Sequence, residues 1–180
     1  GKTGNSNPSG RIMAADDGRV YGFGRTKYGW GSAFEYKLYA TPIAGPASAE
    51  APRKRKKKGA DTDKRRSKAK PAKGTVWSVD SPILVRGMVR AGSELLIVGP
   101  EKLFEEAEAI QKFDTSQVQK SLQAQDRARH GKAELHGVSA ADGKTIRKLT
   151  LPSMPVWDGM AVAGGSLYVS CEDGTVRRLK

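Results

Sequence analysis

Cysteine and histidine are scarce in this 180-residue sequence, which has one cysteine and two histidines. The lone thiol, Cys171, cannot form an internal disulfide, and nothing near it resembles the cationic or helix-terminal setting of a reactive cysteine. We interpret it as a small packed residue at the end of a strand. No apolar run is long enough to cross a bilayer, and the first residues lack a cationic start followed by an apolar stretch. We therefore expect no membrane span, and we expect any signal peptide to precede Gly1.

The usual catalytic arrangements are also missing. His130 and His136 have no Cys or His at metal-ligand spacing, and no Gly-x-Ser-x-Gly word occurs. Asp16 and Asp17 are adjacent, so strand or turn geometry directs their carboxylates apart and they do not form a glycosidase pair. The acidic turns lack the several oxygen ligands at fixed spacing that calcium needs. The sequence therefore predicts no catalytic residue and no metal ligand.

Positive charge is concentrated in one segment. Twelve basic and two acidic residues lie between residues 51 and 74, which gives +10 of the net charge of +13. Because the segment has no aromatic residue and few apolar ones, we predict that residues 41–74 form a disordered basic insertion between two strands. It is either a solvated insertion without a partner or an arm that binds anionic polymers by counterion release. The residues predicted to contact such an anionic surface are Arg53, Lys54, Arg55, Lys56, Lys57 and Lys58.

An internal repeat is the strongest pattern in the chain. Residues 81–98 and 154–170 match at an offset of 72 once one residue is deleted before Asp158. The coinciding pairs are Gly87/Gly159, Met88/Met160, Ala91/Ala163, Gly92/Gly164, Leu95/Leu167 and Ile97/Val169. Apolar residues alternate on either side of a glycine turn, so the pattern predicts a repeated strand, turn, strand unit.

Asp-Gly turns extend the β pattern. They occur within residues 15–21, 141–146 and 172–176, each before a β-branched strand, which suggests one hairpin design used repeatedly. Residues 155–180 therefore predict strand, Gly-Gly turn, strand, Asp-Gly turn, strand. Two linked hairpins of this kind form a small antiparallel meander.

A helical insertion explains the long offset. Residues 100–131 carry apolar side chains at helical spacing, with Pro100 suited to a helix N-terminus and Arg127 and Arg129 suited to a C-terminus before Gly131. Residues 114–116 are expected to divide the segment into two helices. Without these 32 residues the repeat is 40 residues long, close to the roughly 40–50 residues of a propeller blade.

Several short segments of the sequence resemble those of a known protein family. They are Val138-Ser139-Ala140-Ala141-Asp142-Gly143-Lys144, Asp158-Gly159-Met160-Ala161 and Leu167-Tyr168-Val169-Ser170, with a similar preceding unit in residues 10–25 and 35–39. Together they resemble the PQQ-like (pyrroloquinoline-quinone-type) β-propeller repeats of large exported bacterial proteins. The resemblance covers about two-thirds of the chain. It implies a periplasmic, cell-surface or extracellular location.

The resemblance to PQQ-like repeats does not imply that this chain binds a quinone cofactor. The quinone enzymes of this superfamily hold the cofactor against a tryptophan floor, commonly beside a disulfide between adjacent cysteines, with calcium bound by Glu, Asn and Asp. This sequence has a single cysteine and no such cluster, so we predict no cofactor. Trp30, Trp77 and Trp157 are interpreted as aromatics that pack strands or blades.

The predicted fold is all-β, a partial β-propeller of two to three four-stranded antiparallel blades. Without the two insertions about 114 residues remain, too few to close a ring, so residues 1–180 are expected to be the C-terminal portion of a propeller whose remaining blades are its partners. The predicted function is a non-catalytic binding or scaffolding module for a protein or carbohydrate ligand, contacted by Arg86, Trp157 and Asp158 beside the repeated Gly-Met word. The alternatives are part of a quinone- or metal-dependent oxidoreductase with its cofactor site in missing blades, and nonspecific anionic-polymer binding.

Overall fold

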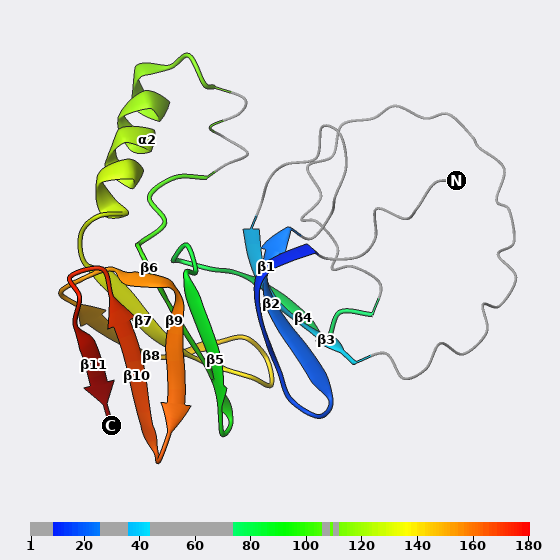
Figure 1. Ribbon diagram of the computed structural model, residues 1–180. Coiled ribbons are helices and arrows are strands. Elements are labelled where there is room, and N and C mark those ends of the chain that lie inside the picture. The colour runs from blue at the N-terminus through cyan, green and yellow to red at the C-terminus, as the bar shows by residue number, and fades with distance from the viewer. Residues whose placement is uncertain (1–8, 26–35, 44–73, 106–108, 110–111) are drawn as a thin grey trace, which may run out of the picture.

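The computed structural model describes residues 9–25, 36–43, 74–105, 109 and 112–180, which form a mostly β structure (Figure 1). It contains three antiparallel sheets and one long helix, so the all-β prediction is confirmed for the described residues. None of their helices is long and apolar enough to cross a membrane. Residues 44–73 lie outside this part, so the disorder and the anionic contacts predicted there stay predictions. The predicted boundary at residue 41 is wrong, because Thr41 and Pro42 belong to a strand.

Each sheet is a meander whose strands pair in chain order. The first sheet contains β1 (Ser9–Ala15), β2 (Arg19–Arg25), β3 (Tyr36–Pro42) and β4 (Trp77–Asp80). The second contains β5 (Gly87–Ala91), β6 (Glu94–Gly99), β7 (Ala133–Ser139) and β8 (Thr145–Leu151). The third contains β9 (Pro155–Ala163), β10 (Ser166–Cys171) and β11 (Val176–Leu179), the three strands predicted for residues 155–180 and one fewer than the four of a complete blade.

The repeat found in the sequence is present as two equivalent hairpins. The pair β5 and β6 opens the second sheet, and the pair β9 and β10 opens the third. Ala91 pairs with Glu94 and Ala163 pairs with Ser166, so each hairpin turns through two residues. Gly164 and Gly165 both have positive φ, of 54° and 69°, as a type I′ turn requires.

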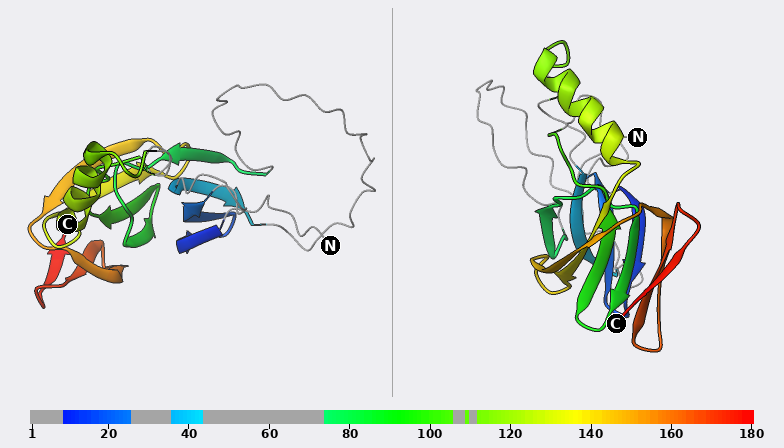
Figure 2. Two further views of the ribbon diagram at one scale, coloured as in Figure 1. Left: turned by 90° about the horizontal axis from the view of Figure 1, so that it is seen from above. Right: turned by 90° about the vertical axis from the view of Figure 1, so that its left-hand side faces the viewer.

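The three sheets follow one another along an open arc, as the view from above shows (Figure 2). The first strands of the sheets lie next to each other, with β5 in contact with β1 on one side and with β9 on the other. The described sheets do not close into a ring. Later strands of each sheet lie progressively further from this shared edge.

The inner strand β6 of the second sheet is buried on both faces, whereas the edge strand β8 is mostly exposed. In β6, Leu95 and Ile97 belong to the core shared with the first sheet, whereas Leu96 and Val98 belong to the core shared with the third. Successive side chains of a strand point to opposite faces, so a strand between two cores needs an unbroken apolar run. The sequence Leu-Leu-Ile-Val of residues 95–98 is such a run.

The insertion before β7 is helical only in part. The helix α2 (Ser116–Ala128) follows Thr115 at its N-cap, which places one predicted boundary correctly. The predicted start at Pro100 is wrong, because the backbone there continues the strand: the Pro100 carbonyl accepts a hydrogen bond from Leu84 N at 2.9 Å. Buried Gln125 ties α2 to this segment through Leu103 N and Glu101 O, both at 2.8 Å.

The three Asp-Gly turns share their local chemistry but not their place in the sheets. In each, an aspartate Oδ1 accepts the N–H of the residue two positions later: Asp16 from Gly18 at 3.0 Å, Asp142 from Lys144 at 3.2 Å and Asp173 from Thr175 at 3.0 Å. Such Asx turns need only local residues. They join the first and second strands of the first sheet, the third and fourth of the second, and the second and third of the third. The turn design is therefore used repeatedly, but at non-equivalent positions.

Asp16 also links the first sheet to the second. Its Oδ2 accepts hydrogen bonds from the Tyr21 hydroxyl at 2.9 Å and from Arg90 Nε at 3.3 Å. Arg90 in turn lies over the Tyr21 ring, 5.6 Å from its centroid. The Gly18 N–H, followed by the Tyr21 hydroxyl, holds the pKa of Asp16 below its usual value.

We expect the Asp16 contacts to make stability depend on pH in the acid range. Because the folded-state pKa lies below the unfolded value of about 3.9, the stabilisation is present above that value and is lost as pH falls through the folded-state pKa. Thermal melts should show a lower Tm for Asp16→Asn than for the wild type at neutral pH. The difference should shrink as the pH approaches the folded-state pKa, and a gap that stays constant down to that pH would contradict the prediction.

Gly99, at the end of β6, allows the segment before β5 to pack closely against the backbone at this position. A Cβ at Gly99 would lie 2.0 Å from the Leu84 carbonyl oxygen, which is backbone and cannot turn aside. Gly99→Ala should therefore destabilise the fold by about 1–3 kcal/mol in urea unfolding. Gly131→Ala is the matched control, because the nearest atoms lie 3.9 Å from its Cβ position, and it should change stability by less than about 0.5 kcal/mol. Equal midpoints for the two variants would show that the Gly99 contact relaxes freely.

Candidate functional site

The strand β9 is interrupted by a bulge at its start. Met160 pairs with Val169 and Pro155 pairs with Cys171, so the four residues 156–159 face a single residue of β10. Gly159 fits this crowded stretch because a Cβ there would lie 2.4 Å from Val156 Cγ2. Bulges redirect side chains and are frequent beside functional sites.

Asp158 carries the backbone strain of this bulge. Its φ of 56° is the one positive value at a non-glycine residue in the described part of the chain. Its N–H donates to the Arg86 carbonyl at 2.7 Å, so the bulge is attached to the chain leading into β5 rather than to β10. Arg86 and Asp158 hold equivalent positions in the repeat, and the structure brings the two into direct contact.

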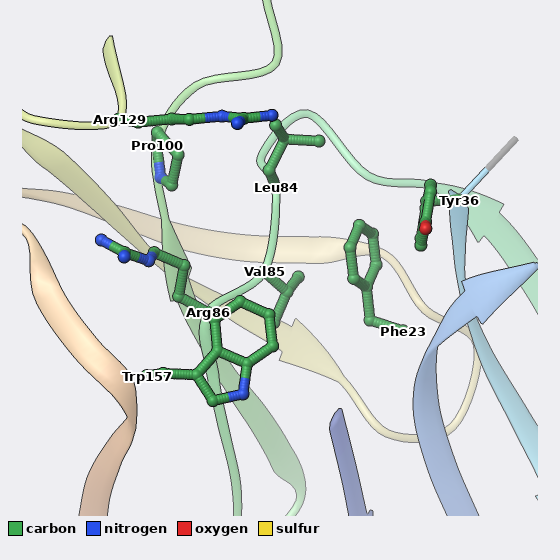
Figure 3. A pocket seen from close by; sticks show the side chains of 8 residues that line it. All are labelled: Phe23, Tyr36, Leu84, Val85, Arg86, Pro100, Arg129 and Trp157. Carbon is green, nitrogen blue, oxygen red and sulfur yellow. The ribbon is translucent and has the colours of Figure 1, made fainter. Parts of the chain in front are cut away.

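The bulge places Trp157 at a pocket of about 260 Å³ (Figure 3). The lining residues come from the first and third sheets, from the segments just before β5 and just after β6, and from the C-cap of α2: Phe23, Tyr36, Leu84, Val85, Arg86, Pro100, Arg129 and Trp157. Trp157 is 52% exposed, which is unusual for so large an apolar side chain. Figure 3 shows the indole and the Phe23 ring on different walls of the open space, with Arg129 extending past Pro100 toward Leu84.

The two guanidinium groups of the pocket differ in their partners. Arg86 Nη1 forms an ion pair with Glu172 Oε1 at 2.8 Å, which joins the start of β5 to the turn between β10 and β11. Arg129 is the C-cap residue of α2, and its side chain has no carboxylate within ion-pair distance among the described residues. Figure 3 shows the Arg86 guanidinium directed away from Phe23 and Tyr36. Arg129 is thus the cation of this pocket that has no acidic partner in the described ranges of the chain.

The aromatic wall on the first sheet is a stacked pair. The rings of Phe23 and Tyr36 lie 5.5 Å apart with an interplanar angle of 29°. Phe23 is buried on β2, and Tyr36 begins β3 opposite Arg25. Together with Trp157 they give the pocket aromatic surface on two sides.

The predicted contact residues come together in part. Arg86 and Trp157 line the same pocket, whereas Asp158 contributes through its backbone and its carboxylate does not line the space. The sequence did not predict Phe23, Tyr36 or Arg129 as contact residues, although Arg129 was expected at a helix C-terminus, where the structure places it. Aligning the two repeats requires a deletion just before Asp158, and this position coincides with the bulge. The deletion was therefore the one sign in the sequence that β9 does not pair regularly with β10 there.

The tryptophans have different roles. Trp77 packs in the core and donates its indole N–H to the Ala140 carbonyl at 3.0 Å, as a packing aromatic does. Trp157 departs from the predicted packing role, because half of its side chain is exposed and its indole N–H has no hydrogen-bond partner among the described residues. Trp30 lies outside the described residues.

Among the described residues, no three His, Cys, Asp or Glu side chains lie close enough together to hold a metal ion. His136 is buried and lies 2.6 Å from one carboxylate oxygen of Glu134. Its Nδ1 is buried and has no hydrogen-bond partner among the residues that the structure describes. This pair packs within the second sheet and lines none of the pocket around Trp157.

Comparison with known proteins gives no family assignment: no family model matches the chain, and no curated protein sequence matches it. The site therefore has to be interpreted from its own geometry.

The strain at Asp158 makes a stability prediction. Asp158→Val should lower the free energy of unfolding by about 1–2 kcal/mol, because a β-branched residue is strongly disfavoured at positive φ. Asp158→Gly should be neutral or stabilise by up to about 1 kcal/mol, since glycine adopts this φ freely and the carboxylate makes no hydrogen bond with another described residue. Urea unfolding of both variants measures the difference. A valine variant as stable as the glycine variant would mean that the bulge is not held in this conformation.

Proposed function

We propose that this chain is a non-catalytic binding module of the β-propeller type, in which each sheet is one blade. Three features support the architecture: meander sheets that follow chain order, first strands that lie side by side, and a repeated hairpin that opens two successive sheets. The resemblance to PQQ-like repeats supports the same interpretation and favours an exported protein. The remaining blades of such a ring would be partners of this unit.

The pocket around Trp157 is the proposed ligand site. The observation that carries it is an exposed indole held on a strained bulge, opposite a guanidinium that has no acidic partner among the described residues. Strained backbone persists where the surrounding structure enforces it, and such strain is frequent at binding sites. Large aromatic and arginine side chains are also the residues that dominate binding energy at recognition sites.

The test is to locate binding by NMR. The Trp157 indole N–H signal, assigned by its loss in Trp157→Phe, is followed while saccharides and peptides are added to the chain. We expect at least one ligand class to shift this signal and the backbone signals of Arg86 and Arg129, with saturation. Trp157→Ala should weaken that binding by at least about tenfold with little change in unfolding midpoint, since the side chain is half exposed. Saturable shifts confined to other surfaces would contradict the proposed site.

Anionic-polymer binding through residues 51–74 is a second candidate, favoured by the net charge of +10 in that segment. It predicts that a chain lacking residues 51–74 elutes from a heparin column at much lower salt, since counterion release makes such binding steeply salt-dependent. A chain that keeps these residues but carries Trp157→Ala should elute with the wild type. Unchanged elution after the deletion would contradict polymer binding by this segment.

A further inference from the structure

Resting on the proposed function, we infer that the pocket around Trp157 binds a ring that carries an oxyanion, such as a carboxylate or phosphate. The first argument is the polar character of its lining. Arg129 and the Trp157 indole N–H are donors, Arg86 is a donor already paired with Glu172, and the Tyr36 phenol can donate or accept. No carboxylate or amide side chain lines the pocket in the part of the chain that the structure describes. A ligand group that only accepts hydrogen bonds satisfies such a lining, and an oxyanion is that group.

The second argument concerns charge. Glu172 already neutralises Arg86 at 2.8 Å, whereas the Arg129 guanidinium has no carboxylate partner among the described residues. A single negative charge on the ligand therefore completes the pairing in the pocket. Arginine suits this role because its planar fork matches carboxylate and phosphate oxygens with two parallel hydrogen bonds.

The third argument concerns shape. The apolar lining consists of the Trp157 indole, the Phe23 ring and the side chains of Leu84, Val85 and Pro100. An exposed indole face binds a flat ring, either an aromatic ring or the C–H face of a sugar. A space of about 260 Å³ lies just below the usual range for small-molecule pockets and suits a ligand built on one ring.

The same chemistry has two possible sources, an aromatic acid and an acidic sugar residue. The probes are sodium benzoate, phenyl phosphate and sodium galacturonate, each compared at constant ionic strength with a neutral counterpart, benzyl alcohol or galactose. We expect the acids to shift the Trp157 indole signal with saturation and the neutral compounds to bind at least about tenfold more weakly, the loss that an unmade charge-assisted hydrogen bond produces. Preference between benzoate and galacturonate identifies the source.

Three variants test the assignment of charge. Arg129→Gln should weaken binding of the acids by at least about tenfold and leave the neutral compounds unchanged. Arg127→Gln is the matched control, because this exposed residue lies two positions earlier in the chain and does not line the pocket. Glu172→Gln should tighten binding of the acids, because it removes the carboxylate that competes for Arg86.

The outcomes separate the two proposals. If neutral sugars or peptides shift the Trp157 signal as strongly as the acids, the inferred ligand class is wrong and the binding site stands. If Arg129→Gln and Arg127→Gln bind the acids equally well, the role of Arg129 is wrong. If neither these probes nor the saccharides and peptides move the Trp157 signal, both the ligand class and the proposed site are wrong.

Discussion

The structure depends on one constraint: the inner strand β6 of the second sheet must be apolar on both faces. Leu95 and Ile97 close the core with the first sheet, and Leu96 and Val98 close the core with the third. Neither outer sheet has another described partner of this kind, so β6 holds the two cores together. Successive side chains of β6 point to opposite faces, so a register shift of one residue would move each of them into the other core. The register of β6 is therefore strongly constrained.

Polar contacts then set how neighbouring sheets meet. The Ala140 carbonyl accepts from both Arg19 and Trp77, which fixes the first sheet against the end of β7. The third sheet is held against the start of β5 by two contacts of Arg86: its carbonyl accepts from the Asp158 N–H, and its guanidinium pairs with Glu172. The pocket around Trp157 lies where this second group of contacts meets the end of α2, so its shape follows from how the sheets are joined.

Patterns with a local cause could be predicted from the sequence. The two equivalent hairpins, the three strands after residue 154 and the helix boundary at Thr115 follow from side-chain alternation, turn glycines and helical spacing. Features set by distant contacts could not be predicted. Pro100 continues a strand because its carbonyl meets Leu84, and Arg129 reaches a pocket whose other walls come from residues more than 20 positions away in the chain. A tryptophan in a strand is expected to pack in a core, and Trp157 is exposed because it lies in the bulge of β9.

The contact between Arg86 and Asp158 has a consequence for symmetry. These residues occupy the same position in successive repeats, yet one contributes its carbonyl and the other its N–H. The sheets are therefore joined head to tail, by a heterologous interface rather than by a two-fold axis. The interface between the first and second sheets uses different residues, with Trp77 and Arg19 donating to the Ala140 carbonyl and Arg90 donating to Asp16. Each junction between the described sheets therefore has its own set of contacts, although the hairpins that meet there are built from the same repeated sequence.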